Sequence, residues 1–337
     1  INKIKGYYMS HQPLVKVQDL HVRFVSHETD VSVVNGVSFD LKAGEVLCLL
    51  GESGSGKSVT MRSLMRLLPR SAQLQGEVTI DGIDVVNLPD DQLHTIRGSV
   101  ISMIFQEPLT AFDPVFTIGQ QISEAIQINF GVDKVEARSR ALELLELVQI
   151  PSAARRLDAY PHELSGGLRQ RAMIALALSC RPKLLLADEP TTALDATVQI
   201  QVLLLLRELQ QKMGMATIFV THDLGVACEV ADKIAVMYGG RFVETGSVED
   251  VLLNPQHPYT KGLMRSTVHG GKRGELLKPI EGSPPDLSDL PPGCSFAPRC
   301  TQAQAACSAR IPDMVQVGSQ HFSRCIHSSQ MLAEETV

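Results

Sequence analysis

The chain has 337 residues, of which 44% are hydrophobic and 20% charged, and its net charge is −6. These values are typical of a folded soluble protein of two or three domains, and the negative charge argues against a protein that binds nucleic acid by neutralising phosphates. No apolar run approaches the roughly 20 residues that span a bilayer, so we expect a cytoplasmic protein that meets a membrane only through partners.

Up to about residue 105 the sequence is typical of β-structure. Residues 1–8 precede the first methionine, Met9, and lack the apolar core of a signal peptide, so we expect them to be an extension of the folded chain. Alternating apolar residues or short apolar runs predict strands at 15–24, 37–41, 46–50, 78–80 and 100–105. A helix is expected at 58–68, because Pro69 prevents its continuation.

From residue 107 the pattern changes to helices. Apolar residues at helical spacing predict helices at 135–148, 168–179 and 198–213. Apolar runs typical of buried strands return at 184–187, 216–220 and 234–238. Strands that alternate with helices around a strand–glycine loop–helix unit predict a mostly parallel sheet flanked by helices, into which the all-helical middle is inserted.

A glycine-rich segment follows the apolar run at 46–50. It consists of Gly51, Glu52, Ser53, Gly54, Ser55, Gly56, Lys57 and Ser58, and it matches the phosphate-binding P-loop pattern. Its glycines allow backbone N–H groups to turn toward phosphates, and the N-terminus of the following helix adds the positive end of a dipole. We expect Lys57 to reach the β- and γ-phosphates of a nucleotide and Ser58 to bind Mg²⁺.

Two adjacent carboxylates end the apolar run at 184–187. Asp188 is predicted to hold Mg²⁺, through water, and Glu189 to orient and polarise an attacking water molecule. Two adjacent acidic residues after an apolar run are common by chance, so this pair indicates a nucleotide site only in combination with the P-loop upstream. Ser165, Gly166 and Gly167 precede a predicted helix and form a second anion-binding arrangement, although an N-cap with a flexible turn explains an isolated Ser-Gly-Gly equally well.

Together these motifs resemble the ATP-binding cassette family over about residues 14–250. The resemblance implies a signature sequence at residues 164–171, a glutamine loop at Gln106, a switch histidine at His222, and an aromatic ring, Phe24, against adenine. A core position in its strand explains Phe24 equally well. The family's usual signature has glutamine where this chain has Leu168. Because the serine and the glycine amides make the phosphate contacts, this difference preserves the mechanism but leaves open how active the half-site is.

The resemblance implies ATP and Mg²⁺ as cofactors and Glu189 and His222 as catalytic residues. The residues expected to bind ATP or Mg²⁺ are Phe24, Gly51, Glu52, Ser53, Gly54, Ser55, Gly56, Lys57, Ser58, Val59, Gln106, Ser165, Gly166, Gly167 and Asp188. Among them, Ser58, Gln106 and Asp188 are expected to bind Mg²⁺. The signature loop of one subunit is expected to complete the ATP site of its partner, so function requires a dimer.

The same resemblance implies an α/β fold of the P-loop NTPase (RecA-like) type. It has a mostly parallel sheet core with an antiparallel N-terminal part, an inserted helical subdomain and a small cysteine-rich C-terminal extension. We place the nucleotide-binding core at 9–106 and 170–250, the helical signature subdomain at 107–169 and the extension at 251–337.

The C-terminal part resembles the ATPases of oligopeptide and dipeptide importers, on residues 254–260 and a cysteine-rich tail. The resemblance implies an ATPase that energises peptide import at the cytoplasmic face of the membrane. Its implied partners are a second ATPase subunit in a homo- or heterodimer, two integral membrane permease subunits and an extracytoplasmic substrate-binding protein. A transporter of the same type that carries nickel, glutathione or antimicrobial peptides is an alternative. A cassette ATPase of DNA maintenance is less favoured, because basic surface and a long coiled coil are missing, so nucleic acid is not an expected partner.

The tail contains four clustered cysteines, Cys294, Cys300, Cys307 and Cys325, after a proline-rich stretch at 279–298 with too little apolar content for a core. The clustering of four of the seven cysteines within 32 residues disfavours incidental thiols, and a reducing cytoplasm disfavours disulfides, which leaves a metal site. We favour a [4Fe–4S] cluster, which some importer ATPases carry, over Zn²⁺, whose ligands are usually more closely spaced; His321 and His327 are alternative zinc ligands. The expected role is a structural staple that leaves ATP binding largely unchanged.

Overall fold

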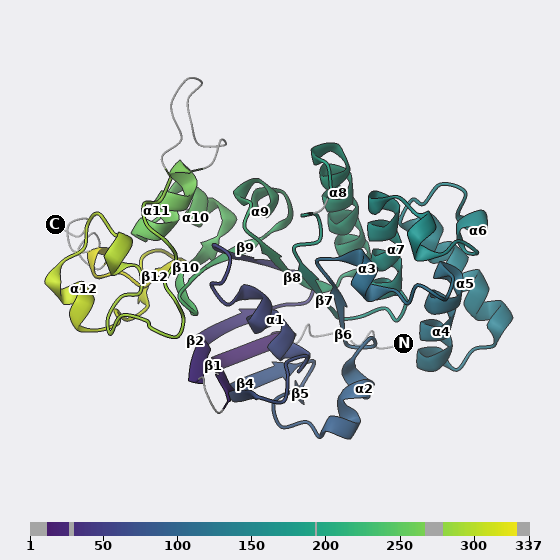
Figure 1. Cartoon of the computed structure of the whole chain (residues 1–337), viewed down its shortest axis with the longest axis horizontal. Helices are drawn as coiled ribbons and strands as arrows, with labels where there is room; N and C mark the ends of the chain where they lie inside the picture. Colours follow the sequence, from purple (N-terminus) through teal and green to yellow (C-terminus); the bar gives the residue numbers. More distant parts are fainter. Residues whose placement is uncertain (1–11, 27–29, 193, 267–278, 329–337) are drawn as a thin grey trace, which may run out of the picture.

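The computed structural model describes residues 12–26, 30–192, 194–266 and 279–328. The predicted N-terminal extension and the outer limits of the first and last domains, at residues 9 and 337, lie outside these residues. Two sheets occupy the centre of the molecule, with a helical region at one end and the cysteine-containing extension at the other (Figure 1). Among the described residues, no helix is long and apolar enough to cross a bilayer.

The N-terminal part forms a four-stranded antiparallel sheet in the order β2-β1-β4-β5. Its strands are β1 (Val15–Val25), β2 (Asp30–Leu41), β4 (Ala72–Ile80) and β5 (Ile83–Asp84). A bulge at Asp19, where φ is 48°, interrupts the pairing of β1 with β4 opposite Gly76. Glycine is required at position 76, because the φ angle of Gly76 is 104° and a Cβ atom would lie 2.4 Å from the Asp19 carbonyl oxygen.

The second sheet has eight strands in the order β11-β12-β10-β9-β3-β8-β7-β6. Five neighbouring strands are parallel: β9 (Lys233–Tyr238), β3 (Val46–Leu50), β8 (Ala216–Thr221), β7 (Leu184–Asp188) and β6 (Ile101–Ile104). The antiparallel strands are β10 (Arg241–Ser247), β12 (Phe322–Ser323) and β11 (Val315–Gln316). The predicted fold, a mostly parallel sheet with an antiparallel N-terminal part, is confirmed.

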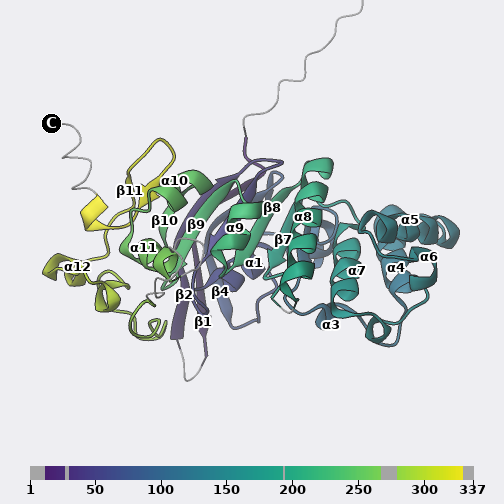
Figure 2. The same ribbon diagram turned by 90° about the horizontal axis from the view of Figure 1, so that it is seen from above.

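The parallel strands are buried on both faces, which is why their sequences are continuously apolar. Leu184 and Leu186 of β7 pack toward α1 (Lys57–Leu64) and the antiparallel sheet. Leu185 and Ala187 pack into the other core, beneath the helices of the opposite face. These helices are α7 (Gly166–Leu178), α8 (Ala196–Met213) and α9 (Leu224–Val230), and Figure 2 shows them along that side of the sheet.

The helical region follows β6. Its helices are α3 (Pro108–Ala111), α4 (Ile118–Phe130), α5 (Lys134–Leu147), α6 (Ala153–Arg156) and the short η2 (Pro161–Glu163). Local chemistry sets their ends, since Thr117 and Gln120 form a capping box at α4 and the Asp133 side chain caps α5. The predicted domain boundary between residues 169 and 170 falls inside α7, which is continuous from Gly166 to Leu178.

Two sequence expectations need correction. The helix expected at 58–68 ends at Leu64, because Arg66 adopts a left-handed conformation with φ 51° before Pro69 is reached. The proline-rich stretch was expected to bury no core, but Phe296 is buried against the rings of Tyr238 and Tyr259. The remaining short elements are η1 (Asp90–Gln92), α2 (Leu93–Ile96), α10 (Val248–Leu253), α11 (Pro258–Arg265), η4 (Ala297–Arg299) and α12 (Ala305–Ala309).

Candidate nucleotide site

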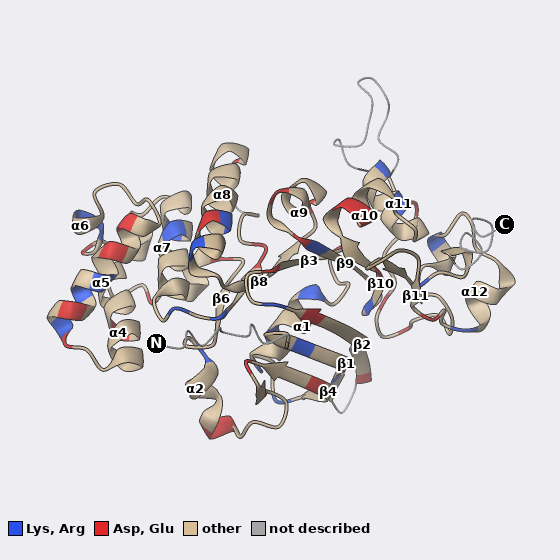
Figure 3. Cartoon of the chain, turned by 180° about the vertical axis from the view of Figure 1, so that it is seen from behind, with Lys and Arg blue, Asp and Glu red and all other residues tan. Residues whose placement is uncertain are grey.

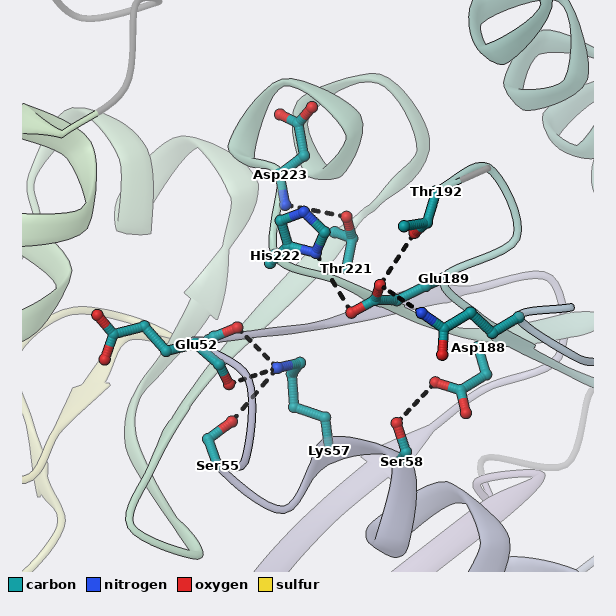
Figure 4. A network of polar contacts seen from close by, with 12 residues as sticks. Glu52, Ser55, Lys57, Ser58, Asp188, Glu189, Thr192, Thr221, His222 and Asp223 are labelled. Carbon is teal, nitrogen blue, oxygen red and sulfur yellow. Dashed lines mark hydrogen bonds and ion pairs between the residues drawn. The ribbon is translucent and has the colours of Figure 1, made fainter. Parts of the chain in front are cut away.

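Four neighbouring strands of the large sheet end at one edge, and predicted site residues follow each of them. The glycine-rich loop follows β3, and His222 follows β8. Asp188 ends β7, Glu189 comes next, and Gln106 lies just beyond β6. Because the carboxyl ends of parallel strands meet at one edge, residues far apart in the sequence are brought together there (Figure 4).

The glycine-rich loop wraps around its own lysine. The Lys57 Nζ atom donates to the carbonyl oxygens of Gly51, at 2.7 Å, and Glu52, at 2.8 Å. Burial lowers the pKa of Lys57, and the nearby carboxylates of Glu189 and Asp188 act in the opposite direction. An ammonium group held among oxygens at the N-terminal end of α1 is suited to exchange those oxygens for phosphate oxygens.

Ser58 and Asp188 form the second part of the site. The Ser58 hydroxyl donates to Asp188 Oδ1 at 2.8 Å, and Arg62 Nη2 lies 3.7 Å from Asp188 Oδ2. Asp188 is 2% exposed, and burial raises the pKa of its carboxyl group. A hydroxyl and a carboxylate side by side are the oxygen ligands that Mg²⁺ prefers, so these residues fit the predicted ion.

Glu189 is the centre of the third part. Its Oε2 atom accepts hydrogen bonds from Thr192 Oγ1 at 2.9 Å and from Gln106 Nε2 at 3.3 Å. His222 Nδ1 lies 3.3 Å from its Oε1 atom. Glu189 also has a left-handed backbone, with φ 45°, which is uncommon for a residue with a side chain and occurs at functional sites. The predicted catalytic pair is therefore brought together.

These groups open onto a cavity of about 740 Å³. Its lining contains the predicted residues Gly51, Glu52, Ser53, Gly54, Ser55, Gly56, Lys57, Ser58, Val59, Gln106, Glu189 and His222. The lining also includes four residues that sequence reasoning missed, Val33, Leu263, Ser266 and Leu287. Leu263, Ser266 and Leu287 all belong to the C-terminal extension, so the extension forms part of the cavity wall.

Asp188 does not itself line this cavity but accepts a hydrogen bond from Ser58, which does. Two further groups of predicted residues lie outside the lining. Phe24 is half-buried on β1, where it packs against the core beside α1. Ser165 is the exposed N-cap of α7, and its side chain makes no capping hydrogen bond. Gly166 and Gly167 begin that helix, and a Cβ at Gly167 would lie 2.8 Å from Val198 Cγ1. Ser165 and Gly166 are therefore presented outward, whereas Leu164, Gln170 and Arg171 of the signature are buried.

The extension also contacts the phosphate loop directly, which sequence reasoning missed. The Glu52 backbone N–H donates to the Tyr259 hydroxyl at 2.9 Å, and the Glu52 carboxylate pairs with Arg299. Tyr259 lies in the segment 254–260 that marked the importer resemblance, whereas the contact of Arg299 depends on how the extension packs. The extension lies far in sequence from the phosphate loop but packs against that loop in the fold.

The four clustered cysteines are free thiols, of which Cys307 and Cys325 are buried. Burial raises the pKa of the Cys294, Cys300 and Cys325 thiols, and other thiols of the group raise it further. Backbone N–H groups point at the sulfur atoms from Phe296, Gln302, Gln304 and His327.

Among the residues that the structure describes, no three or more His, Cys, Asp or Glu side chains are arranged to hold a metal ion. The suggested alternative ligands are engaged elsewhere. His321 Nε2 lies 2.7 Å from Glu244 Oε1, and His327 Nε2 lies 2.8 Å from the Gln302 carbonyl oxygen. The expectation that either histidine replaces a cysteine at a zinc site is therefore not supported.

Comparison with known proteins adds independent evidence. A family model for ABC transporters matches residues 34–192, and one for the C-terminal region of oligopeptide/dipeptide transporters matches residues 243–307. The chain is 46% identical to the dipeptide transport ATP-binding protein DppD of Bacillus subtilis, over 93% of this chain and 94% of that protein. It is also 46% identical to the oligopeptide transport ATP-binding protein OppD of Salmonella typhimurium, over 89% of each.

A solved structure with the same arrangement is a dimeric ATP-binding cassette in a post-hydrolysis state, bound to ADP and phosphate. It is 30% identical in sequence, with a TM-score of 0.63, and the similarity covers 69% of this chain and 98% of that chain.

Proposed function

The chain belongs to the ATP-binding subunits of ABC transporters, in the oligopeptide and dipeptide importer family, and from this premise we propose how it energises peptide import. The observation that carries the proposal is the convergence of Lys57, Glu189 and His222 on one cavity, beside the Ser58 hydroxyl that Asp188 holds. Hydrolysis of ATP to ADP and phosphate is the reaction that these groups support.

Each group has a distinct task in that reaction. Lys57 exchanges its loop carbonyls for the β- and γ-phosphate oxygens, and Ser58 and Asp188 hold Mg²⁺, with Gln106 near it. The ion, when bound, neutralises phosphate charge. Glu189 accepts a hydrogen bond from the attacking water and aligns it with the γ-phosphorus, while His222 holds the Glu189 carboxylate in place.

The signature segment supports a composite site. Ser165, Gly166 and Gly167 lie outside the cavity of their own chain, so we assign them to the ATP of a second ATPase subunit, in a homo- or heterodimer. The helix N-terminus that they form is suited to phosphate. Phe24 is proposed to stack on adenine, at the side of the site toward β1.

Exposed apolar residues near Gln106 support the proposed membrane partners. Leu109, Val115 and Phe116 are 54%, 69% and 49% exposed. Exposed apolar side chains of this kind are suited to a protein interface, here with two permease subunits at the cytoplasmic face of the membrane, through which an extracytoplasmic substrate-binding protein delivers cargo. Positive and negative residues are interspersed along the ribbon (Figure 3), which does not favour a DNA-binding role.

We propose that the four cysteines of the extension bind a [4Fe–4S] cluster. Support comes from their gathering in one region and from the backbone N–H groups that point at their sulfurs, since such hydrogen bonds tune cluster thiolates. Zn²⁺ is the alternative, although its ligands are usually more closely spaced in the sequence than these cysteines. Protein purified without oxygen should contain iron and acid-labile sulfide, and Cys300→Ser should lose both. Zinc without iron, or no metal at all, would contradict the proposal.

The cargo is tested by uptake. The chain, its partner ATPase and its permeases are reconstituted in proteoliposomes with the binding protein, and Mg-ATP is supplied on the side of the ATPases. Labelled di- and oligopeptides should accumulate with Mg-ATP and fail to accumulate with a non-hydrolysable analogue. Accumulation of nickel or glutathione in place of peptides would replace the substrate class and leave the ATPase assignment intact.

A further inference from the structure

The phosphate loop has a neighbour that the reaction itself does not use. Arg299 ends η4 and immediately precedes Cys300. Its guanidinium forms a bidentate pair with the Glu52 carboxylate: Nη1 donates to Oε2 at 2.7 Å, and Nη2 donates to Oε1 at 3.2 Å. The Arg299 side chain is 6% exposed and the Glu52 side chain 26% exposed, so this ion pair is less exposed to water than a typical surface pair.

Arg299 is held in one geometry. Besides the two bonds to Glu52, its Nη1 donates to the Tyr238 hydroxyl at 3.2 Å. Its Nε and Nη2 donate to the carbonyl oxygens of Glu281, at 2.9 Å, and Ile280, at 3.3 Å. An arginine has five N–H donors, and these contacts supply five acceptors. A lysine at this position would not reproduce such a fork.

Glu52 is in turn held from three directions. Its carboxylate binds Arg299, its backbone N–H binds the Tyr259 hydroxyl, and its carbonyl accepts from Lys57. Tyr259 packs on the rings of Tyr238 and Phe296, with ring centroids 4.5 and 5.4 Å away. The start of the phosphate loop is therefore fixed to the end of β9 and to the C-terminal extension.

We propose that Arg299 is a positioning residue of the nucleotide site, which holds the phosphate loop, through Glu52, in the conformation that binds ATP. The inference rests on the proposed function, because ATP is the ligand for which the loop is positioned. Arg299 touches no reacting atom. Its loss leaves a loop that nucleotide binding must order, so affinity falls while turnover at saturation changes little.

The first test is Arg299→Ala in the full chain. The Kd for Mg-ADP, measured by calorimetry, should rise about tenfold, the loss typical of a charge-assisted pair. In the assembled transporter, KM for ATP should rise by a similar factor, with kcat within about twofold of wild type. Arg299→Lys should recover only part of the affinity. Arg310→Ala, which removes an exposed arginine of the same extension, should leave Kd unchanged.

The second test separates positioning from general damage to the extension. If Arg299 acts through Glu52, then Arg299→Ala should have little further effect on Kd in a Glu52→Gln background. An equal loss in both backgrounds would overturn the inference, and so would a wild-type Kd for Arg299→Ala. Should that variant not fold, the same comparison with Arg299→Lys decides. Lys57→Ala serves as the reference: unchanged nucleotide binding there would reject the proposed function itself.

Discussion

At the scale of residues, the sequence predicts the groups that follow strands and misses those that depend on distant packing. Lys57, Ser58, Asp188, Glu189 and His222 all follow buried strands, so their convergence at one sheet edge follows from the strand pattern. The contacts of Arg299 and Tyr259 with Glu52 could not be predicted in this way, since they join residues hundreds of positions apart through a segment with little regular structure.

Lys57→Ala should weaken nucleotide binding by about 1.5–3 kcal/mol, because a charge-assisted contact with the phosphates is lost. The oxygens of Gly51 and Glu52 also lose their donor, so part of the loss comes from the loop itself. Calorimetry with Mg-ADP measures the total loss of binding free energy. Lys212→Ala, at an exposed site near the end of α8, is the matched control and should bind normally. An unchanged affinity for Lys57→Ala would mean that the loop is not the phosphate site.

At the scale of elements, strands were predictable and helix ends were less so. The parallel strands are covered on both faces and need continuous apolar runs, which few other structures require. The end of α1 depends on the left-handed turn at Arg66, which no glycine or proline marks. The pairing of β12 with β10 was not predictable from such short strands, and buried polar contacts hold it in place.

Glu244 on β10 is the centre of those contacts and is fully buried. It accepts hydrogen bonds from the backbone N–H groups of Gln256 and His257, and it pairs with His321 beside β12. Glu244→Gln should lower the free energy of unfolding by about 1.5–3 kcal/mol, because an amide offers one acceptor oxygen where the carboxylate offers two. Urea denaturation measures the loss. The exposed Glu229→Gln is the control, and equal stability of both variants would contradict this role.

At the scale of the whole molecule, one chain carries two different half-sites: a phosphate-loop half and a signature half, which lie at different places on its surface. The phosphate loop, Glu189 and His222 share one cavity, whereas Ser165 is exposed at the start of α7 and outside it. The related cassette of known structure is a dimer with ADP and phosphate bound. An isolated chain should therefore hydrolyse ATP feebly, and its turnover should rise steeply with the partner ATPase and permeases present.

The most direct test of this account is phosphate release by the assembled transporter, with and without Glu189→Gln. The account predicts that the variant binds Mg-ATP with wild-type affinity, accumulates in the ATP-bound dimer and loses at least about 99% of turnover, since the carboxylate orients water and does not hold nucleotide. Near-normal phosphate release by the Glu189→Gln transporter would contradict it, as would full, concentration-independent turnover by a demonstrated monomer of the wild-type chain.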